Sequence, residues 1–179
     1  MKRLLCVLLV LMPALGSGCN ALAVTPLTVE TEYLSDDEKA MYVAFIGNCT
    51  INGIMTGEDA VVPSVEINDD SMTVRFVPLA NTSFDFDFHE GSLAWVSLTM
   101  SVDDEYVLSN VSTLYIVFVE ACNPEIDTET AKEIVTYLFD HLSYDAECDG
   151  DFATYFTTSE SYTLLHTPPD SILLIEPAR

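Results

Sequence analysis

Acidic side chains alternate along residues 145–151, a spacing that could bind a hard cation. The carboxylates are Asp145, Glu147, Asp149 and Asp151, and Gly150 stands before the last of them. Carboxylate oxygens at alternate positions, next to a glycine that permits a sharp turn, suit the coordination of Ca²⁺. The segment is therefore a candidate calcium site. An acidic surface turn without metal is the competing interpretation and the one that we favour.

The same spacing resembles the start of an EF-hand loop. That resemblance implies a bidentate Glu at the twelfth position of the loop and a helix after it. Counted from Asp145, the twelfth residue is Phe156, and the residues that follow the acidic segment predict a strand. A calcium site here would need carboxylates from elsewhere in the chain to complete it.

A second candidate metal-binding group consists of Asp85, Asp87 and His89, which share one face of a predicted strand. Two carboxylates and an imidazole can bind a transition metal. Residues two apart on a strand are separated by about 6.6–6.8 Å, so these side chains do not converge on one ion. The opposite face carries three aromatic residues, Phe84, Phe86 and Phe88. The pattern favours a half-buried strand with a polar outer face over a metal centre.

Motifs for catalysis are missing from the sequence, which contains no GxSxG, HExxH or SxxK. Its three histidines, His89, His141 and His166, are each interpreted as a surface or helix-capping residue. With 29 acidic residues in the chain, a pair of carboxylates is weak support for a glycosidase. We therefore expect a non-enzymatic role, and a carboxylate-based hydrolase is the weakest alternative.

The first residues have the organisation of an export signal. Lys2 and Arg3 precede an apolar run from Leu4 to Leu15, and small residues then lead to Cys19. This is the order of the charged region, hydrophobic region and processing site in a secretory leader. The apolar run is too short to span a bilayer, which requires about 20 residues.

The end of this leader, residues 17–19 (Ser-Gly-Cys), resembles the lipobox of bacterial lipoprotein precursors. The resemblance implies that Cys19 carries a diacylglycerol, that cleavage occurs just before it, and that the protein is anchored on the outer face of a bacterial membrane. It covers about the first twenty residues, and Gly16 stands where the family usually has Leu. An ordinary leader cut after residues 21–23 (Ala-Leu-Ala) is the alternative, and it would remove Cys19.

The charge balance excludes two kinds of partner. The chain has 29 acidic and 6 basic residues, and loss of Lys2 and Arg3 with the leader leaves a net charge of −25. Nucleic acids and anionic lipid surfaces both require clustered Lys and Arg, so neither is an expected partner of the folded domain. The hydrophobic fraction of 49% is sufficient for one core, so we expect a folded and highly soluble domain.

Three cysteines, Cys49, Cys122 and Cys148, lie beyond the leader and Cys19. Because export permits disulfides, two states of these cysteines are possible. Either two of them form a disulfide and the third is a free thiol, or all three are buried thiols. The sequence contains no CxxC, and neither a zinc ribbon nor a thioredoxin-like motif is supported.

Hydrophobic periodicity predicts the following elements. A capping-box spacing at Ser35 starts a helix over 36–55, either continuous or broken near Gly47. Strands follow over 65–67, 72–76, 84–89 and 93–100. A second helix begins near 103 and runs to 121, and a strand is the alternative over 114–119. The last helix spans 127–142. Strands complete the chain over 152–158, 162–167 and 171–176.

The predicted order of helix, four strands, two helices and three strands indicates an α+β fold, an antiparallel sheet with about three helices on one face. The expected organisation is a lipoprotein-type signal peptide (1–19), a short tether (20–28) and a single acidic domain (29–179). The sequence is interpreted as a non-enzymatic envelope lipoprotein that binds a protein or a polymer. A secreted calcium-binding protein using residues 145–151 is the alternative.

Overall fold

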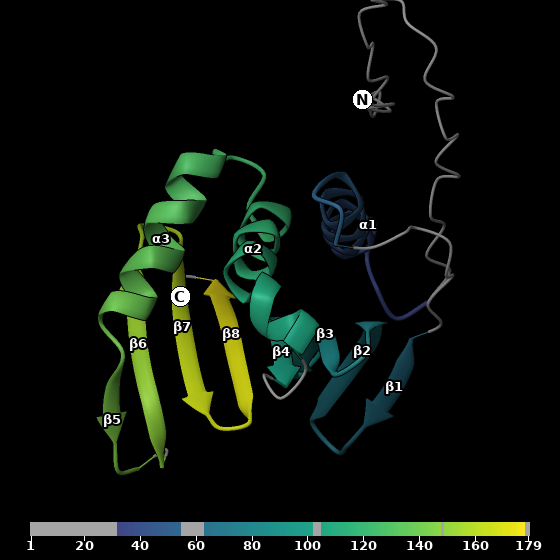
Figure 1. Ribbon diagram of the computed structural model, residues 1–179. Coiled ribbons are helices and arrows are strands. Elements are labelled where there is room, and N and C mark those ends of the chain that lie inside the picture. Colours follow the sequence, from purple (N-terminus) through teal and green to yellow (C-terminus); the bar gives the residue numbers. More distant parts are fainter. Residues whose placement is uncertain (1–31, 55–62, 102–104, 148, 178–179) are drawn as a thin grey trace, which may run out of the picture.

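The computed structural model describes residues 32–54, 63–101, 105–147 and 149–177. Within these ranges the chain forms three helices and eight strands (Figure 1). In chain order they are α1 (Asp36–Ile51), β1 (Ser64–Ile67), β2 (Ser71–Leu79), β3 (Thr82–His89), β4 (Ser92–Ser101), α2 (Glu105–Cys122), α3 (Thr128–Asp140), β5 (Ser143–Asp145), β6 (Gly150–Phe156), β7 (Glu160–Thr167) and β8 (Asp170–Pro177).

The described strands form one antiparallel sheet with the order β1-β2-β3-β4-β8-β7-β6-β5. Each half of the sheet is a four-stranded meander, and the last strands of the two meanders, β4 and β8, pair at the centre. Leu98 of β4 lies opposite Leu173 of β8 there, and both side chains are buried. The two halves therefore share one core.

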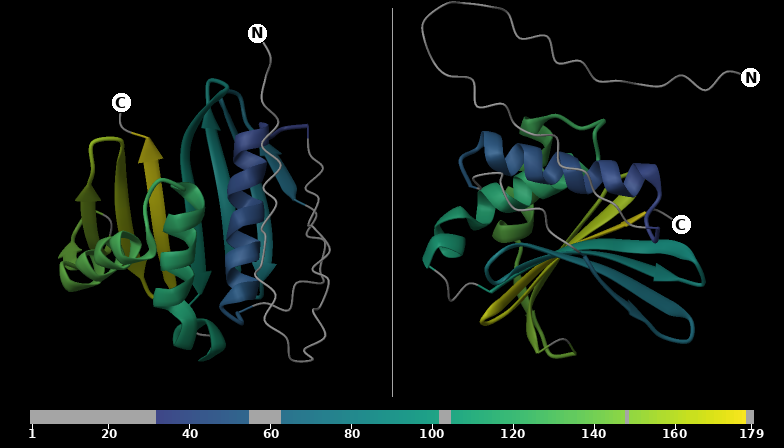
Figure 2. Two further views of the ribbon diagram at one scale, coloured as in Figure 1. Left: turned by 90° about the horizontal axis from the view of Figure 1, so that it is seen from above. Right: turned by 90° about the vertical axis from the view of Figure 1, so that its right-hand side faces the viewer.

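All three helices pack on the same face of the sheet, as the two views of Figure 2 show. Helix α1 lies over β2 and β3, α2 lies over β4 and β8, and α3 lies over β6 and β7. The predicted α+β class is thereby confirmed. None of the described helices is long and apolar enough to cross a membrane.

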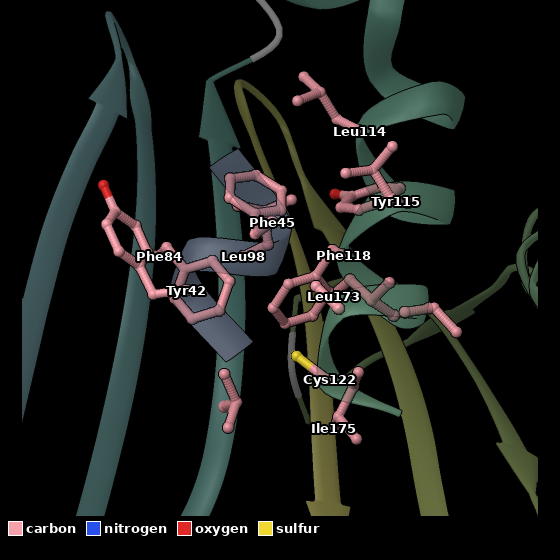
Figure 3. Packing of buried hydrophobic residues seen from close by; sticks show 14 of the residues in the cluster. Tyr42, Phe45, Phe84, Leu98, Leu114, Tyr115, Phe118, Cys122, Leu173 and Ile175 are labelled. Atoms are coloured by element: carbon pink, nitrogen blue, oxygen red, sulfur yellow. The ribbon is translucent and has the colours of Figure 1, made fainter. Parts of the chain in front are cut away.

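Phe84 of β3 is the point where the sheet and two helices meet (Figure 3). Its ring lies 5.4 Å from that of Tyr42 and 5.1 Å from that of Phe45, both on α1, and 5.2 Å from that of Phe118 on α2. All four side chains are fully buried. Aromatic rings in these edge and tilted arrangements add to the free energy of apolar burial, so this cluster fixes both helices to the sheet.

The first helix begins where the sequence predicts and ends earlier. The capping box is present, since the Glu38 carboxylate accepts from the Ser35 backbone N–H at 2.6 Å and the Ser35 hydroxyl accepts from the Glu38 N–H at 3.3 Å. The helix is continuous through Gly47 and stops at Ile51, not near residue 55. Gly53, with a φ of 70°, follows it in a left-handed conformation that helices commonly use to terminate.

Two further expectations are corrected. The strand alternative over residues 114–119 is wrong, because these residues belong to α2. Packing against α1, α3, β4 and β8 buries most of residues 114–122 and overrides their β-branched composition. The predicted order also omits β5 (Ser143–Asp145). This strand has three residues, mostly exposed, and so lacks the apolar alternation by which strands are recognised.

Replacing Phe84, the central aromatic residue of the core, should reveal how much its ring contributes to the stability of the fold. We expect Phe84→Ala to lower the free energy of unfolding by about 3–5 kcal/mol, because it removes a buried ring and leaves a cavity between α1, α2 and the sheet. Phe156→Ala is the matched control, since that ring is 75% exposed. Urea denaturation of both variants measures the difference, and equal effects would contradict the assignment of Phe84 to the core.

Candidate functional site

The face of the sheet opposite the helices carries polar side chains over β2, β3 and β4. Because Phe84 and Phe86 point toward the helices, Asp85 and Asp87 lie on the other face. The register places Arg75 and Ser97 on either side of Asp85, and it places Thr73 and Trp95 on either side of Asp87. Two carboxylates of one strand thus stand in adjacent rows on the uncovered face.

Asp85 is neutralised within the protein. Its carboxylate accepts two hydrogen bonds from the Arg75 guanidinium, from Nε and NH2 at 2.9 Å each, and one from the Ser83 hydroxyl at 3.3 Å. The carboxylate raises the pKa of Arg75, chiefly through this hydrogen bonding. Asp85 is only 4% exposed although it lies on the uncovered face, so the ion pair satisfies an almost buried charge.

Asp87 accepts hydrogen bonds from neighbouring side chains but forms no ion pair within the described residues. The Thr73 hydroxyl donates to its Oδ1 at 2.6 Å, and the Trp95 side chain forms a second hydrogen bond. Partial burial raises the pKa of Asp87 above its ordinary value, and the charge of Asp85 raises the pKa further, against the lowering effects of these hydrogen bonds and of the nearby Arg75 guanidinium. Across the described ranges, the ion pairs formed are Arg75–Asp85 and Lys132–Glu129, and neither includes Asp87.

A cavity of about 440 Å³ opens at this carboxylate. Its lining residues come from three adjacent strands and are Ser71, Thr73, Asp87, Phe88, His89 and Trp95. The β3–β4 pairing is irregular here, because Asp87 faces Trp95 whereas Phe88 faces Leu93, so that β4 carries one extra residue. Such bulges redirect side chains, and this one places the indole opposite the carboxylate.

A second hollow of about 330 Å³ lies at the end of β2 and β3, beside their connecting turns. The two share Ser71 and Phe88. Three carboxylate residues line the second hollow, Asp69, Asp70 and Glu90, together with Met72. The two turns that carry these carboxylates are joined by a hydrogen bond from the Glu90 backbone N–H to the Asp70 carbonyl oxygen at 2.9 Å. Met72 and Phe88 form one pair of the β2–β3 ladder and belong to the helix-covered face, so this hollow does not continue the cavity at Asp87.

The candidate calcium residues lie in or beside the turn that joins β5 and β6. The Asp145 carboxylate accepts from the Glu147 backbone N–H at 2.7 Å, and the Asp149 carboxylate accepts from the Tyr144 hydroxyl at 3.0 Å. Asp151 faces His166 across the β6–β7 ladder. In the parts of the chain that the structure describes, these and other His, Cys, Asp and Glu side chains form no group of three placed to hold a metal ion.

Gly150 has a packing role that accounts for its presence in this turn. A Cβ at this position would lie 2.5 Å from the Thr167 hydroxyl oxygen and 2.9 Å from the His166 carbonyl oxygen. Both distances are shorter than van der Waals contact, so only glycine fits against the end of β7. The glycine that suggests a calcium loop in the sequence is required here by the approach of a neighbouring strand.

The remaining candidates are separate from this surface or outside the described residues. His141 caps α3, where its Nδ1 lies 2.8 Å from the Tyr137 carbonyl oxygen, which confirms the capping interpretation. Cys49 and Cys122 are buried free thiols, and burial raises the pKa of Cys49 to about 12. Cys19 and Cys148 lie outside the described residues, as do the leader and the tether.

Comparison with family models, with curated proteins and with solved structures finds no match to this chain.

The two ion pairs provide a matched test of the Asp85 environment. We expect Arg75→Met to lower the free energy of unfolding by about 2–3 kcal/mol, because it leaves the carboxylate of Asp85 almost buried and without its cation. Lys132→Met removes the exposed pair with Glu129 and should leave stability nearly unchanged. Thermal and urea denaturation measure both variants. A similar small effect in each would show that water solvates Asp85.

Proposed function

We propose that this chain is a non-enzymatic binding protein of the bacterial cell envelope, exported and held on the outer face of a membrane by lipid attached to Cys19. The observation that supports a binding role is the cavity of about 440 Å³ at Asp87, on the face that the helices leave uncovered. Small-molecule sites have volumes of this order, with a mostly apolar lining and a few polar groups that orient the ligand.

Binding explains this surface better than catalysis does. Asp87 accepts its hydrogen bonds from Thr73 and Trp95, and the contacts of the described residues include none between this carboxylate and His89, which lines the same cavity. The two described thiols, Cys49 and Cys122, are buried, and burial raises the pKa of each, so neither supplies a thiolate nucleophile. A fixed carboxylate with an adjacent indole and hydroxyl is a set of groups for recognition.

The proposed anchor fits the charge of the domain. The chain between residues 19 and 32 can span at most roughly 45 Å, which sets the reach of a tether from Cys19. The acidic domain is repelled by an anionic lipid surface, so electrostatic adhesion cannot hold it there. Acyl chains supply the attachment, and more than one is needed for stable anchoring.

Metabolic labelling tests the anchor. In a bacterial host fed a labelled fatty acid, we expect the label to enter the wild-type protein and to be absent from Cys19→Ala, because the thioether and the new amino terminus both depend on that thiol. Cys6→Ala is the matched control, since Cys6 belongs to the leader, and it should keep full labelling.

Two results would contradict the anchor. One is equal labelling of Cys19→Ala and wild type. The other is an unmodified amino terminus of the native protein that begins beyond Ala23, measured by mass spectrometry of the intact product.

A further inference from the structure

We propose, building on the binding role above, that the uncovered face of the sheet binds a neutral oligosaccharide. One pyranose ring would lie in the cavity at Asp87, against the indole of Trp95, with its hydroxyl groups donating to Asp87 and Thr73. Further rings would extend along β3 toward a second cavity on the same face. The ligand class is thus a polymer with many hydroxyl groups and no charge.

Asp87 and Thr73 present only hydrogen-bond acceptors to a ligand in this cavity. The Thr73 hydroxyl uses its hydrogen in the bond to Asp87, so its oxygen can only accept from a ligand. An ionised carboxylate has about four acceptor positions, of which the Thr73 hydroxyl and the Trp95 indole fill two. These two neighbouring residues therefore require a ligand with neighbouring O–H donors.

The indole of Trp95 presents apolar surface to the same cavity. Its N–H group is engaged with Asp87, and an indole has no other polar atom. Thr73, Asp87 and Trp95 form one row across β2, β3 and β4, so the acceptors and the ring lie side by side. A pyranose ring with equatorial hydroxyls has O–H groups at its rim and C–H groups on its faces. Such a ring can satisfy the acceptors and cover the indole at once.

Charges of both signs already act on this row, which favours a neutral ligand. The Arg75 guanidinium lowers the pKa of Asp87, against the larger effect of burial, and its side chain is 49% exposed. An added cation would be repelled by Arg75, and an added anion would be repelled by Asp85 and Asp87. A neutral ligand meets neither penalty.

A second cavity on the uncovered face lies in line with the first along β3. Its volume is about 290 Å³, and its lining residues include Asn81, Ser83, Thr99, Ser101 and Asp170. Ser83 faces Thr99 in the β3–β4 ladder, two rows on the same face from the pair of Asp87 and Trp95. The two rows are about 13 Å apart along the strand. This arrangement favours an extended oligosaccharide over a single sugar.

Three tetramers with one β-1,4-linked skeleton test the proposal. Cellotetraose is neutral, the glucosamine tetramer carries ammonium groups and the glucuronate tetramer carries carboxylates. Trp95 is the only tryptophan of the chain, so its fluorescence and its indole N–H signal in NMR report on the cavity at Asp87. We expect saturable changes, with cellotetraose bound more tightly than either charged tetramer and more tightly than cellobiose.

Calorimetry of matched variants locates the site. Trp95→Ala should weaken cellotetraose binding by roughly tenfold or more, whereas Phe156→Ala removes an exposed ring of β6 and should leave the affinity unchanged. Asp87→Asn keeps the shape of its side chain, should cause a similar loss, and tests the site if Trp95→Ala fails to fold. Thr99→Val replaces a hydroxyl by a methyl group in the second cavity and should weaken binding of cellotetraose but not of cellobiose.

Other results overturn the proposal in distinguishable ways. Tighter binding of either charged tetramer would contradict the neutral ligand and leave the proposed binding role intact. Equal affinities of Trp95→Ala and Phe156→Ala would place the sugar outside the cavity. No response of Trp95 to millimolar cellotetraose would remove the saccharide site, whereas the lipid anchor, which labelling tests, would be untouched. Release of shorter sugars from cellotetraose would overturn the non-enzymatic role on which this proposal rests.

Discussion

The structure depends on the alternation of aromatic and acidic side chains along β3. Phe84, Phe86 and Phe88 can be buried only if all three face the helices, because side chains two apart on a strand share a face. The same geometry forces Asp85 and Asp87 to the other side. A shift of the strand by one residue would bring carboxylates into the aromatic core, so the register of β3 is strongly fixed. Core and candidate site are thus two consequences of one pattern.

Two carboxylates on one strand have different environments as a result. Asp85 meets Arg75 across the β2–β3 ladder and forms a paired, nearly buried charge that the fold itself satisfies. Asp87 meets Thr73 and Trp95, which donate hydrogen bonds without supplying a positive charge. Burial raises the pKa of Asp87, so its ionised form lowers the stability of the fold above that pKa. This cost disappears as the pH falls through the pKa and the carboxyl becomes protonated.

Periodicity in the sequence predicted most of the fold, and the failures have physical reasons. The strand β3 and the helices starting at Ser35 and near Asp127 follow local rules of alternation and capping, which need no tertiary information. The β5 strand and the helical state of residues 114–119 depend on neighbours that the sequence does not display. The candidate site shows the same division. Asp85 and Asp87 are visible as the polar face of a strand, whereas their partners Arg75, Thr73 and Trp95 are brought to them by strand pairing and by a bulge. Gly150 shows another limit of the sequence, because the close approach of β7 that excludes a Cβ at this position is visible only in the structure.

The protonation of Asp87 is the most direct test of this account. The chemical shift of its carboxyl carbon, followed by NMR as a function of pH, reports the ionisation of that one side chain. The account predicts a midpoint above the ordinary value of 3.8, as expected for a partly buried carboxylate without an ion-pair partner. A midpoint at or below that value would mean that solvent or the nearby Arg75 outweighs the effect of burial, and the description of Asp87 as a partly buried carboxylate without an ion pair of its own would be contradicted.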